Sequence, residues 1–566
     1  MDLNLVLAGE AGQGLKTLEA LVGKALFRAG FNIFSSKDYM SRVRGGHNFM
    51  SIRFGSGKMQ APRQEIDILL ALNDESIEKH QAKVPEDGFI LYDGEVDDSR
   101  FININASELA KKINLKAKNS VYAGAVWKLL DLPITILQDL IGAKFSDEDI
   151  ISDNEQLLEA GYNAIDDGIQ INYNKSFLND RNGEEIYISG NQAMGLGAIA
   201  AGVKFYSAYP MTPSTGILNF LAQNQKEFGI VVEQAEDEIG AINMALGASY
   251  SGVRAMTGSS GGGFSLMVEA LGYAGVGEIP LVVAEVQRPG PATGLPTRTG
   301  QGDLLFAINA SQDEFPLIVL APGDQEEAFY QTFRAFNLAD KYHLPVIILS
   351  DQFLADSSKN ISRYKIEDLE VDRNFIDKEK VGPDKYKRYL FTDDGISPRA
   401  YPGQLEDDVV LVDSHEHDEN GFVTEDIELR NKMMVKRFRK LDKYIAEDRK
   451  EPEYIGPEEP DKLIICWGST SGPMKEALNT IKEKDDKIGL LIFKDIWPLP
   501  DSKLKSLASS AEKIISVEAN YSGQLAKLIQ QETAIKIDHK ILKYDGRPFT
   551  AKEIADRYLN EVINHG

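Results

Sequence analysis

Short apolar runs alternate along this chain with segments long enough to form helices, and this alternation constrains the fold more than any other feature. Glycine or proline bounds most of the runs, which have the length of β-strands. Such a pattern is typical of parallel strands connected by crossover helices. The sequence therefore predicts a multidomain α/β protein. The runs are residues 3–9, 67–72, 230–235, 280–286, 344–350, 462–468 and 513–518.

Composition divides the chain into three expected domains. The first, 1–180, opens with a strand, a glycine-rich turn and a helical pattern over 15–30, and it ends in a polar stretch. The second, 187–420, begins glycine-rich and continues into a charged passage. The third, 461–566, returns to the α/β pattern.

Charge, cysteine content and hydropathy exclude several classes of function. The chain has 87 acidic and 62 basic side chains, a net charge of −25, so a nucleic-acid backbone would be repelled. Its single cysteine, Cys466, permits neither an internal disulfide nor a four-thiolate cluster, and we expect it to be a small buried residue in a strand. The apolar runs are far shorter than the ~18 residues that span a bilayer. The first residues lack the basic segment of a secretory signal, and we expect a cytoplasmic protein without a membrane segment.

Two glycine-rich segments of the first domain have the character of anion sites. In 9-GEAGQG-14 a strand turns into a helix, where bare backbone amides attract phosphate, although a tight turn is an equal alternative. The spacing matches neither a P-loop nor a dinucleotide fingerprint. In 42-RVRGGHNF-49, Arg42 and Arg44 precede a flexible Gly45–Gly46 pair and suit a diphosphate, although loop arginines are more often solvated.

A third glycine-rich segment, 257-TGSSGGGF-264, allows two functions. Gly258-x-Ser260-x-Gly262 satisfies the nucleophile elbow of a serine hydrolase, with a downstream histidine as the base. So many glycines, however, loosen a turn that should be rigid. The alternative is a backbone that a flat ligand approaches closely, with hydroxyl groups from Thr257, Ser259 and Ser260. The possible bases are His343, His415, His417, His539 and His565.

Polar residues follow three strands of the second domain, where open parallel sheets bind ligands. Glu238 faces a glycine- and alanine-rich segment, which favours burial of its carboxylate. Arg288 follows the run 280–286 and precedes a loop that contains Thr297. Thr212 lies between two prolines after another strand. Each of these segments alone is more often a rigid turn, but three within one domain indicate a site for a small anion.

Together these segments resemble the 2-oxoacid:ferredoxin oxidoreductases, specifically their α subunit with the γ domain fused at its N-terminus. The γ-type motifs are 9-GEAGQG-14 and 42-RVRGGHNF-49. The thiamine-pyrimidine motifs are 209-YPMTP-213, 236-EDEIGA-241, 257-TGSSGG-262 and 288-RPGPATGLPTRTGQGDL-304. The tail, with 466-CWGSTSG-472 and 518-EANYSGQL-525, is similar to a transketolase C-terminal domain.

The resemblance implies thiamine diphosphate as cofactor and coenzyme A as cosubstrate. It makes Glu238 the catalytic carboxylate that hydrogen-bonds the pyrimidine ring of the cofactor. It assigns Thr212, Arg288 and Thr297 to the substrate carboxylate. The implied cofactor-binding residues are Tyr209, Pro210, Thr257, Ser259, Ser260 and Gly261, and the implied coenzyme A residues are Gly12, Gly14 and Arg44.

The resemblance also implies a partner. The Mg²⁺ and diphosphate site of such enzymes uses a GDG turn and an asparagine pair, and neither occurs in this sequence. We therefore expect a β subunit that carries Mg²⁺ and a 4Fe–4S cluster and passes electrons to ferredoxin, in an αβ or (αβ)2 assembly. The favoured substrate is 2-oxoglutarate, with a broad range of 2-oxoacids as the alternative. Arg298 would pair with a distal carboxylate, although a solvent-facing loop arginine is an equal alternative. This chain alone should be catalytically silent and should bind no metal.

Two other functions stay open at this point. One is the serine hydrolase that uses Ser260. The other is a non-catalytic scaffold that binds coenzyme A or a nucleotide. His415 and His417 stand in an acidic loop, where we expect structural or solvated roles rather than metal binding.

Overall fold

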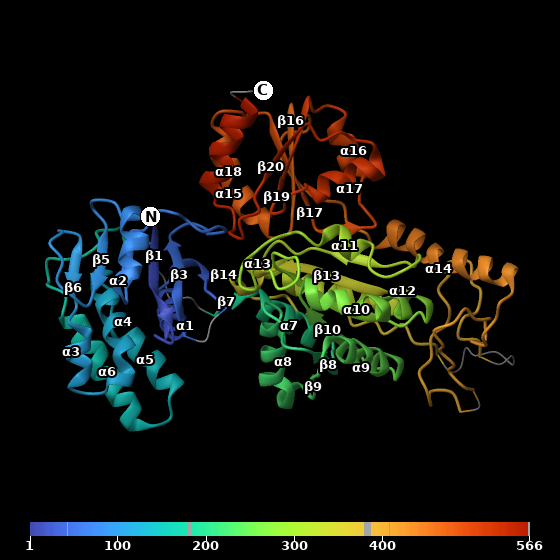
Figure 1. Cartoon of the computed structure of the whole chain (residues 1–566), viewed down its shortest axis with the longest axis horizontal. Coiled ribbons are helices and arrows are strands. Elements are labelled where there is room, and N and C mark those ends of the chain that lie inside the picture. The colour runs from blue at the N-terminus through green and yellow to red at the C-terminus, as the bar shows by residue number, and fades with distance from the viewer. Residues whose placement is uncertain (42–43, 179–182, 378–385, 407, 564–566) are drawn as a thin grey trace. The chain divides into compact units, whose positions relative to one another are not determined.

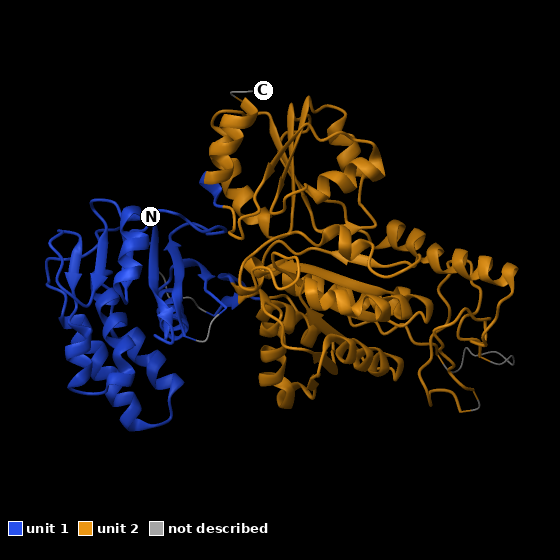
Figure 2. Ribbon diagram, in the orientation of Figure 1, with its two compact units in different colours: residues 1–188, 357–363, 550–552 blue, residues 189–356, 364–549, 553–566 orange. Residues whose placement is uncertain are grey.

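The structure, a computed structural model, describes residues 1–41, 44–178, 183–377, 386–406 and 408–563. Arg42 and His565 lie outside these ranges. Contacts divide the chain into two compact units, which Figure 2 shows in different colours. Both units combine helices with β-sheets, so the predicted multidomain α/β class is confirmed. The first unit contains 1–188, 357–363 and 550–552, and the second contains 189–356, 364–549 and 553–566.

The first unit is built on an eight-stranded mixed sheet (Figure 1). Its strands are β1 (Asp2–Ala11), β2 (Asn32–Asp38), β3 (Gly45–Gly55), β4 (Ile68–Ala71), β5 (Phe89–Tyr92), β6 (Phe101–Asn103), β7 (Glu185–Ser189) and β14 (Ser358–Ser362). Their order is β6-β5-β4-β1-β3-β2-β14-β7. The helices are α1 (Leu15–Arg28), α2 (Asp74–His80), α3 (Ala106–Lys111), α4 (Lys118–Leu129), α5 (Thr135–Lys144) and α6 (Glu148–Asn163). One apolar core joins residues of α1, α4, α5 and α6 to residues of the sheet.

The sheet is parallel only in part. Strands β1, β4, β5 and β6 are parallel neighbours, but β3 runs antiparallel to both β1 and β2. The segment between β2 and β3 is too short for a crossover helix, and an antiparallel pair needs only a short connection. The Gly45–Gly46 pair is therefore not a flexible loop. Both residues belong to β3, and their φ values of 72° and 76° explain why glycine stands there.

The second unit contains a seven-stranded sheet whose order is β18-β12-β13-β11-β10-β8-β9. Its strands are β8 (Phe205–Ala208), β9 (Val231–Gln234), β10 (Ala255–Ser259), β11 (Leu281–Gln287), β12 (Ile318–Leu320), β13 (Pro345–Asp351) and β18 (Asp495–Trp497). All pairs are parallel except β12 with β18. The helices are α7 (Gly190–Ala200), α8 (Thr215–Phe228), α9 (Glu238–Tyr250), α10 (Gly261–Val276), α11 (Leu304–Ile308), α12 (Gln325–Tyr342), α13 (Gln352–Asp356) and α14 (Ile427–Glu447).

The C-terminal part of the same unit forms a five-stranded sheet of order β15-β17-β16-β19-β20. Its strands are β15 (Glu453–Ile455), β16 (Lys462–Trp467), β17 (Ile488–Phe493), β19 (Lys513–Glu518) and β20 (His539–Leu542). Its helices are α15 (Ser471–Lys482), α16 (Ser502–Ala508), α17 (Gln524–Thr533) and α18 (Ala551–Arg557). A continuous apolar core runs from this sheet to the seven-stranded one. Cys466 is buried in β16, as predicted, and burial raises the pKa of its thiol to about 12.

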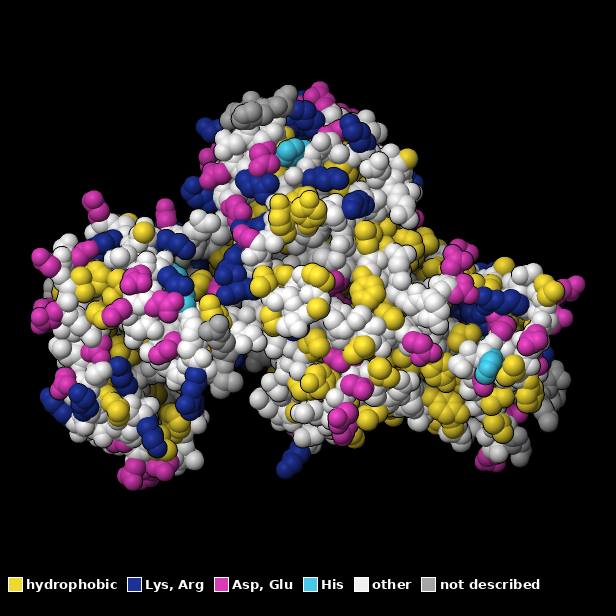
Figure 3. All heavy atoms as spheres, viewed as in Figure 1, with side chains coloured by type: hydrophobic (Ala, Val, Ile, Leu, Met, Phe, Trp, Pro, Cys, Tyr) yellow, Lys and Arg dark blue, Asp and Glu magenta, His cyan; other side chains and the backbone are white. Residues whose placement is uncertain are grey.

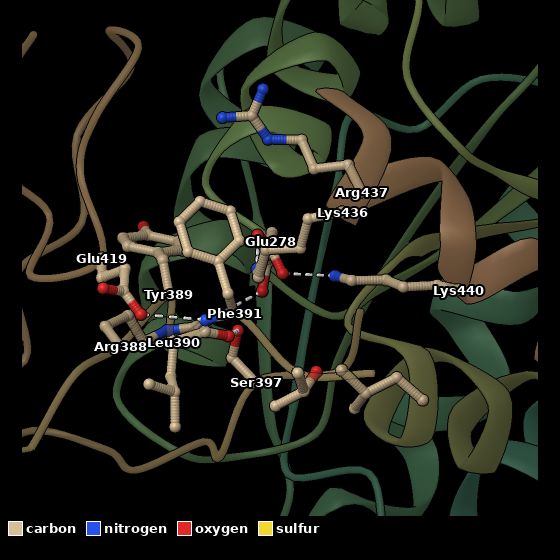
Figure 4. Close-up of polar contacts among 12 residues, drawn as sticks. Glu278, Arg388, Tyr389, Leu390, Phe391, Ser397, Glu419, Lys436, Arg437 and Lys440 are labelled. Carbon is tan, nitrogen blue, oxygen red and sulfur yellow. Dashed lines mark hydrogen bonds and ion pairs between the residues drawn. The ribbon is translucent and has the colours of Figure 1, made fainter. Parts of the chain in front are cut away.

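A buried ion cluster anchors the charged passage to the seven-stranded sheet domain. Glu278 is fully buried, and Lys436 and Lys440 reach it from α14, as Figure 4 shows. The Lys436 Nζ lies 2.6 Å from Glu278 Oε1, and the Nη2 of Arg388 donates to the Glu278 carbonyl at 2.6 Å. Burial alone would raise the pKa of Glu278, but the two lysine charges hold it well below its ordinary value. This passage is acidic in composition, but it contains a helix, α14, that packs against the domain.

Candidate active site

The carboxylate of Glu238 is buried at the start of α9. Asp237 caps this helix, because its side chain accepts a hydrogen bond from the Gly240 N–H at 2.7 Å. The cap turns Asp237 outward and directs Glu238 inward, where only 3% of its surface is exposed. The Ser259 hydroxyl donates to Glu238 Oε1 at 3.2 Å. Glu238 and Ser259, which the sequence assigned to the same site, are thus in direct contact.

The turn from β10 into α10 faces this carboxylate. Thr257 and Ser259 are buried in β10, Ser260 precedes α10, and Gly261 is its first residue. The hydroxyl oxygens of Thr257 and Ser260 are buried without a hydrogen-bond partner among the described residues. A Cβ added at Gly263 would lie 2.7 Å from Glu238 Cδ, and closer still to the Ser259 hydroxyl. Glycine at this position therefore leaves the space that the carboxylate occupies.

Arg288, which follows β11, contacts Thr212, which follows β8. The Arg288 Nη1 donates to the Thr212 carbonyl at 2.6 Å, which leaves Nε and Nη2 as donors for an anion. Partial burial lowers the pKa of Arg288, and the charge of Glu238 acts in the opposite direction. Guanidinium groups stay charged despite such shifts. Of the residues that precede Thr212 in the chain, Pro210 is half-buried and Tyr209 is exposed.

The loop after β11 is hydrogen-bonded both to the seven-stranded sheet and to the C-terminal part of the second unit. Thr297 is buried in it, and the Thr299 hydroxyl donates to Asp351 Oδ1 at 3.3 Å. Further along, Gln301 donates to the Trp467 carbonyl at 3.0 Å and accepts from the Ala519 N–H at 2.9 Å. Arg298 is half-buried beside Gly546. This loop is therefore held by specific contacts at the edge of the site.

Three residues of this region were not predicted from the sequence: Gly263, Glu285 and Asp303. Glu285 is fully buried in β11, and neither carboxyl oxygen has a hydrogen-bond partner among the described residues. A Cβ added at Gly261 would lie 2.6 Å from Asp303 Oδ2, so this carboxyl group lies against the turn. Burial raises the pKa of Asp303 to about 6. An acid inside the apolar run 281-LVVAEVQ-287 was the available signal for Glu285.

The first unit contains a separate cavity of about 340 Å³ at the glycine-rich turn between β1 and α1. Asn119 fixes the turn, since its Nδ2 donates to the Gln13 carbonyl at 3.1 Å. The cavity is lined by Gly12, Gln13, Gly14, Leu72, Leu115, Lys116, Lys118, Asn119 and Tyr122. Gly12 and Gly14 are thus in it, and the sequence did not single out the two lysines. Arg44 is exposed and is not among the lining residues.

The geometry argues against a serine hydrolase. Ser260 Oγ is buried, and none of the described residues forms a hydrogen bond with it, so the base that would activate it is not in place. His343 is buried at the end of α12, where both of its ring nitrogens lack a described partner. Among the described residues, the geometry therefore gives the hydrolase hypothesis no support at this turn.

His415 and His417 have different environments. His415 is exposed beside Asp413, whereas His417 is buried with its ring 3.8 Å from that of Tyr389. Among the described residues, no group of three or more His, Cys, Asp and Glu side chains is arranged to hold a metal ion.

On the face drawn in Figure 3, lysine and arginine side chains are interspersed with acidic ones over both units. Within the described ranges, no helix combines the length and apolar character that crossing a bilayer requires.

Comparison with known proteins identifies the class. Three sequence families match successive parts of the chain. They are pyruvate ferredoxin/flavodoxin oxidoreductase over 4–164, its thiamine diphosphate-binding domain over 196–436, and pyruvate:ferredoxin oxidoreductase core domain II over 460–554. A 2-oxoacid:ferredoxin oxidoreductase α subunit from Sulfolobus sp. is 34% identical over all of this chain and 98% of its own length. The 2-oxoglutarate synthase subunit KorA of Methanothermobacter thermautotrophicus is 33% identical over 66% of this chain and 98% of its own length.

The solved 2-oxoglutarate:ferredoxin oxidoreductase from Magnetococcus marinus, with 2-oxoglutarate, coenzyme A and succinyl-CoA bound, superposes with a TM-score of 0.90. It is 34% identical, and the match covers 99% of each chain. The chain belongs to the 2-oxoacid:ferredoxin oxidoreductases, as an α subunit with a thiamine diphosphate-binding domain. The predicted family, enzyme class and cofactor are confirmed, and a non-catalytic scaffold is not supported.

Proposed function

We propose that this chain, together with a β subunit, oxidatively decarboxylates 2-oxoglutarate to succinyl-CoA and CO2 and passes the electrons to ferredoxin. The observation that carries the proposal is the buried Glu238 carboxylate, which faces a turn with unpartnered hydroxyls. This turn suits an aminopyrimidine ring, because the hydroxyls of Thr257 and Ser260 lie there, beside the carboxylate, without a described hydrogen-bond partner. The similarity to a 2-oxoglutarate synthase subunit and to a 2-oxoglutarate:ferredoxin oxidoreductase supports 2-oxoglutarate as the substrate.

Each residue then has a distinct chemical role. Bound thiamine diphosphate supplies a nucleophilic carbon and an electron sink for decarboxylation. Glu238 holds a proton at the pyrimidine ring nitrogen of the cofactor. Thr257, Ser259, Ser260 and Gly261 line the ring, with Tyr209 and Pro210 beside them.

The substrate is held by a second group. The free donors of Arg288, with the hydroxyls of Thr212 and Thr297, orient the carboxylate next to the oxo group. Arg298, on the same loop, pairs with the distal carboxylate of 2-oxoglutarate. Arg298→Ala should therefore raise KM for 2-oxoglutarate more than KM for pyruvate, and an equal rise for both would contradict this role.

The cavity of the first unit is proposed to bind coenzyme A. Its backbone turn at Gly12 and Gly14 and its lysines, Lys116 and Lys118, suit phosphate groups. Lys118 is positioned by Ser107 and Asp93, at 2.8 and 3.3 Å. The proposed role of Arg44 in binding coenzyme A has weaker support, because Arg44 does not line this cavity.

A β subunit is proposed to carry Mg²⁺, the diphosphate site and the 4Fe–4S cluster. Large apolar side chains are exposed on the outward sides of α9 and α10 and on the neighbouring loops, as expected of a surface that a partner covers. They are Tyr209, Ile239, Met244, Leu266 and Leu295. We propose a cytoplasmic αβ or (αβ)2 assembly with domains 1–180, 187–420 and 461–566.

The test is 2-oxoglutarate- and coenzyme A-dependent reduction of ferredoxin by the purified αβ complex. Glu238→Gln should lower kcat roughly 10²- to 10⁴-fold, the usual contribution of a positioned acid or base. Glu236→Gln is the matched control, because Glu236 is exposed two residues away. Full activity of Glu238→Gln, or turnover by this chain alone with thiamine diphosphate and coenzyme A, would refute the proposal.

A further inference from the structure

A small cavity of about 10 Å³ lies between the C-terminal end of α9, the residues that precede β11 and the charged passage. Arg388 and Arg399 line it, among apolar side chains such as those of Ile279, Val410 and Val412. None of its described lining residues is acidic. The cavity therefore combines an apolar wall with two cations and belongs to neither of the sites described above.

Both lining arginines have a buried N–H donor without an acceptor. Only 3% of the surface of Arg388 and 4% of that of Arg399 is exposed. Arg388 Nη2 donates to the Glu278 carbonyl at 2.6 Å, and Arg399 Nη2 donates to Asp340 Oδ1 at 2.7 Å. Arg388 Nη1 and Arg399 Nε, in contrast, have no hydrogen-bond partner among the described residues. Leaving such donors unsatisfied is costly, so a pair of them beside one cavity indicates a ligand.

Two hydroxyl groups of the lining already have acceptors. The Ser249 hydroxyl donates to the Pro280 carbonyl, and the Tyr250 hydroxyl donates to the Val410 carbonyl at 2.7 Å. Their protons are thus used within the protein. What remains for a ligand is the positive edge of two guanidinium groups, which attracts an anion and repels a cation.

The surroundings of the cavity carry positive charge in excess of the carboxylates that they contact. Asp340 is shared by three arginines, Arg254, Arg373 and Arg399, at 2.8, 3.1 and 2.7 Å. Glu278 is shared in the same way by the two lysines of α14 (Figure 4). Burial, reinforced by the charges of neighbouring arginines, lowers the pKa of Arg399 to about 10, although Asp340 acts in the opposite direction. A negative ion at this place would offset the excess.

We propose that this cavity binds a single halide ion, chloride under ordinary conditions, held by Arg388 Nη1 and Arg399 Nε. A volume of about 10 Å³ admits one particle of roughly the size of a water molecule, so that sulfate, phosphate and carboxylates are excluded. A halide accepts N–H donors from several directions and tolerates the apolar wall. The bound ion ties the charged passage to the end of α9, the helix that begins with Glu238. This structural role does not depend on the proposed reaction.

Thermal unfolding of the full chain tests the site without turnover. At constant ionic strength, sodium chloride replaces sodium gluconate, whose anion is too large for the cavity. Binding to the folded chain raises the folding equilibrium constant by the factor 1 + [Cl⁻]/Kd, so Tm should rise with chloride. Well above Kd, each tenfold increase in chloride should raise this constant about tenfold. An identical Tm in both salts would mean that the cavity holds only water, and would overturn the proposal.

Two variants separate this site from general effects of salt. Arg399→Met removes one of the two donors and should lose the dependence of Tm on chloride. Arg373→Met is the matched control, because Arg373 also pairs with Asp340 but does not line the cavity, and it should keep this dependence. An equal dependence in the two variants, whether kept or lost, would contradict the assignment of the donors.

Diffraction gives an answer even if Arg399→Met does not fold. Crystals of the native chain grown in sodium bromide should show an anomalous peak within hydrogen-bonding distance of Arg388 Nη1 and Arg399 Nε. Density without an anomalous signal at this position would be a water molecule and would overturn the proposal.

Discussion

Gly263→Ala is the sharpest test of how the Glu238 carboxylate is positioned. The added Cβ would lie 2.7 Å from Glu238 Cδ, whereas carbon atoms in ordinary contact are about 3.5–4.0 Å apart. The carboxyl group must therefore recede by about 1 Å, and a displacement of this size at a reacting group lowers rates about 100-fold. The Ser259 hydroxyl is displaced too, so the hydrogen bond to Glu238 is lost with it.

Gly262→Ala is the matched control. Its Cβ would have Ala292 O as its nearest neighbour, at an ordinary 3.7 Å. Both changes replace glycine by alanine in α10, which stabilises a helix by about 0.5–1 kcal/mol. A difference between the two variants therefore reports on the clash and not on helix propensity.

The assay is steady-state turnover of 2-oxoglutarate by the αβ complex, together with thiamine diphosphate affinity and thermal unfolding of each variant. Gly263→Ala should lose about 100-fold in kcat/KM. Gly262→Ala should retain native turnover with an equal or slightly higher Tm. Native turnover of Gly263→Ala would refute the reasoning, because the carboxylate could then move without consequence.

Three further predictions concern stability, pH and coenzyme A. Glu278→Gln leaves two buried lysines without their carboxylate and should lower the free energy of unfolding by about 3–5 kcal/mol in denaturant titrations, whereas exposed Glu269→Gln should not. Burial raises the pKa of Asp303 from 3.8 to about 6. The folded chain therefore has its full stability below about pH 4, where Asp303 is neutral in both the folded and the unfolded state, and loses stability as the pH rises to 6. Asp303→Asn should thus be more stable than native by roughly 1–3 kcal/mol at pH 8 and equal at pH 4; an equal gain at both would disprove this. Lys116→Glu should weaken coenzyme A binding about 10-fold by calorimetry, and Lys112→Glu, outside the cavity, should not; equal effects would exclude the cavity.

Local sequence chemistry was sufficient for the elements and for the first side chains of the site. Apolar runs such as 280–286 became buried strands, because a run with no polar face must be covered on both sides. Glu238 was identified because a carboxylate next to small residues implies burial, and Arg288 because it follows a strand. These are properties of a residue and its near neighbours in the chain, so they are readable without coordinates.

Other features arose only from pairing between distant segments. The antiparallel course of β3 depends on which strands it joins, and the exposure of Arg44 depends on where that strand begins. A Cβ at position 263 would clash because α9 brings a carboxylate against α10, and Lys116 and Lys118 line the cavity because their segment lies beside the turn after β1.

The sequence by itself determined the α/β class, the family and the carboxylate at position 238, since each follows from local patterns. The tertiary structure alone decided that Glu285 stands beside Ser259, because β10 and β11 are paired in one particular register. A single-residue shift would turn Glu285 to the other face of the sheet, and no local pattern fixes that alignment.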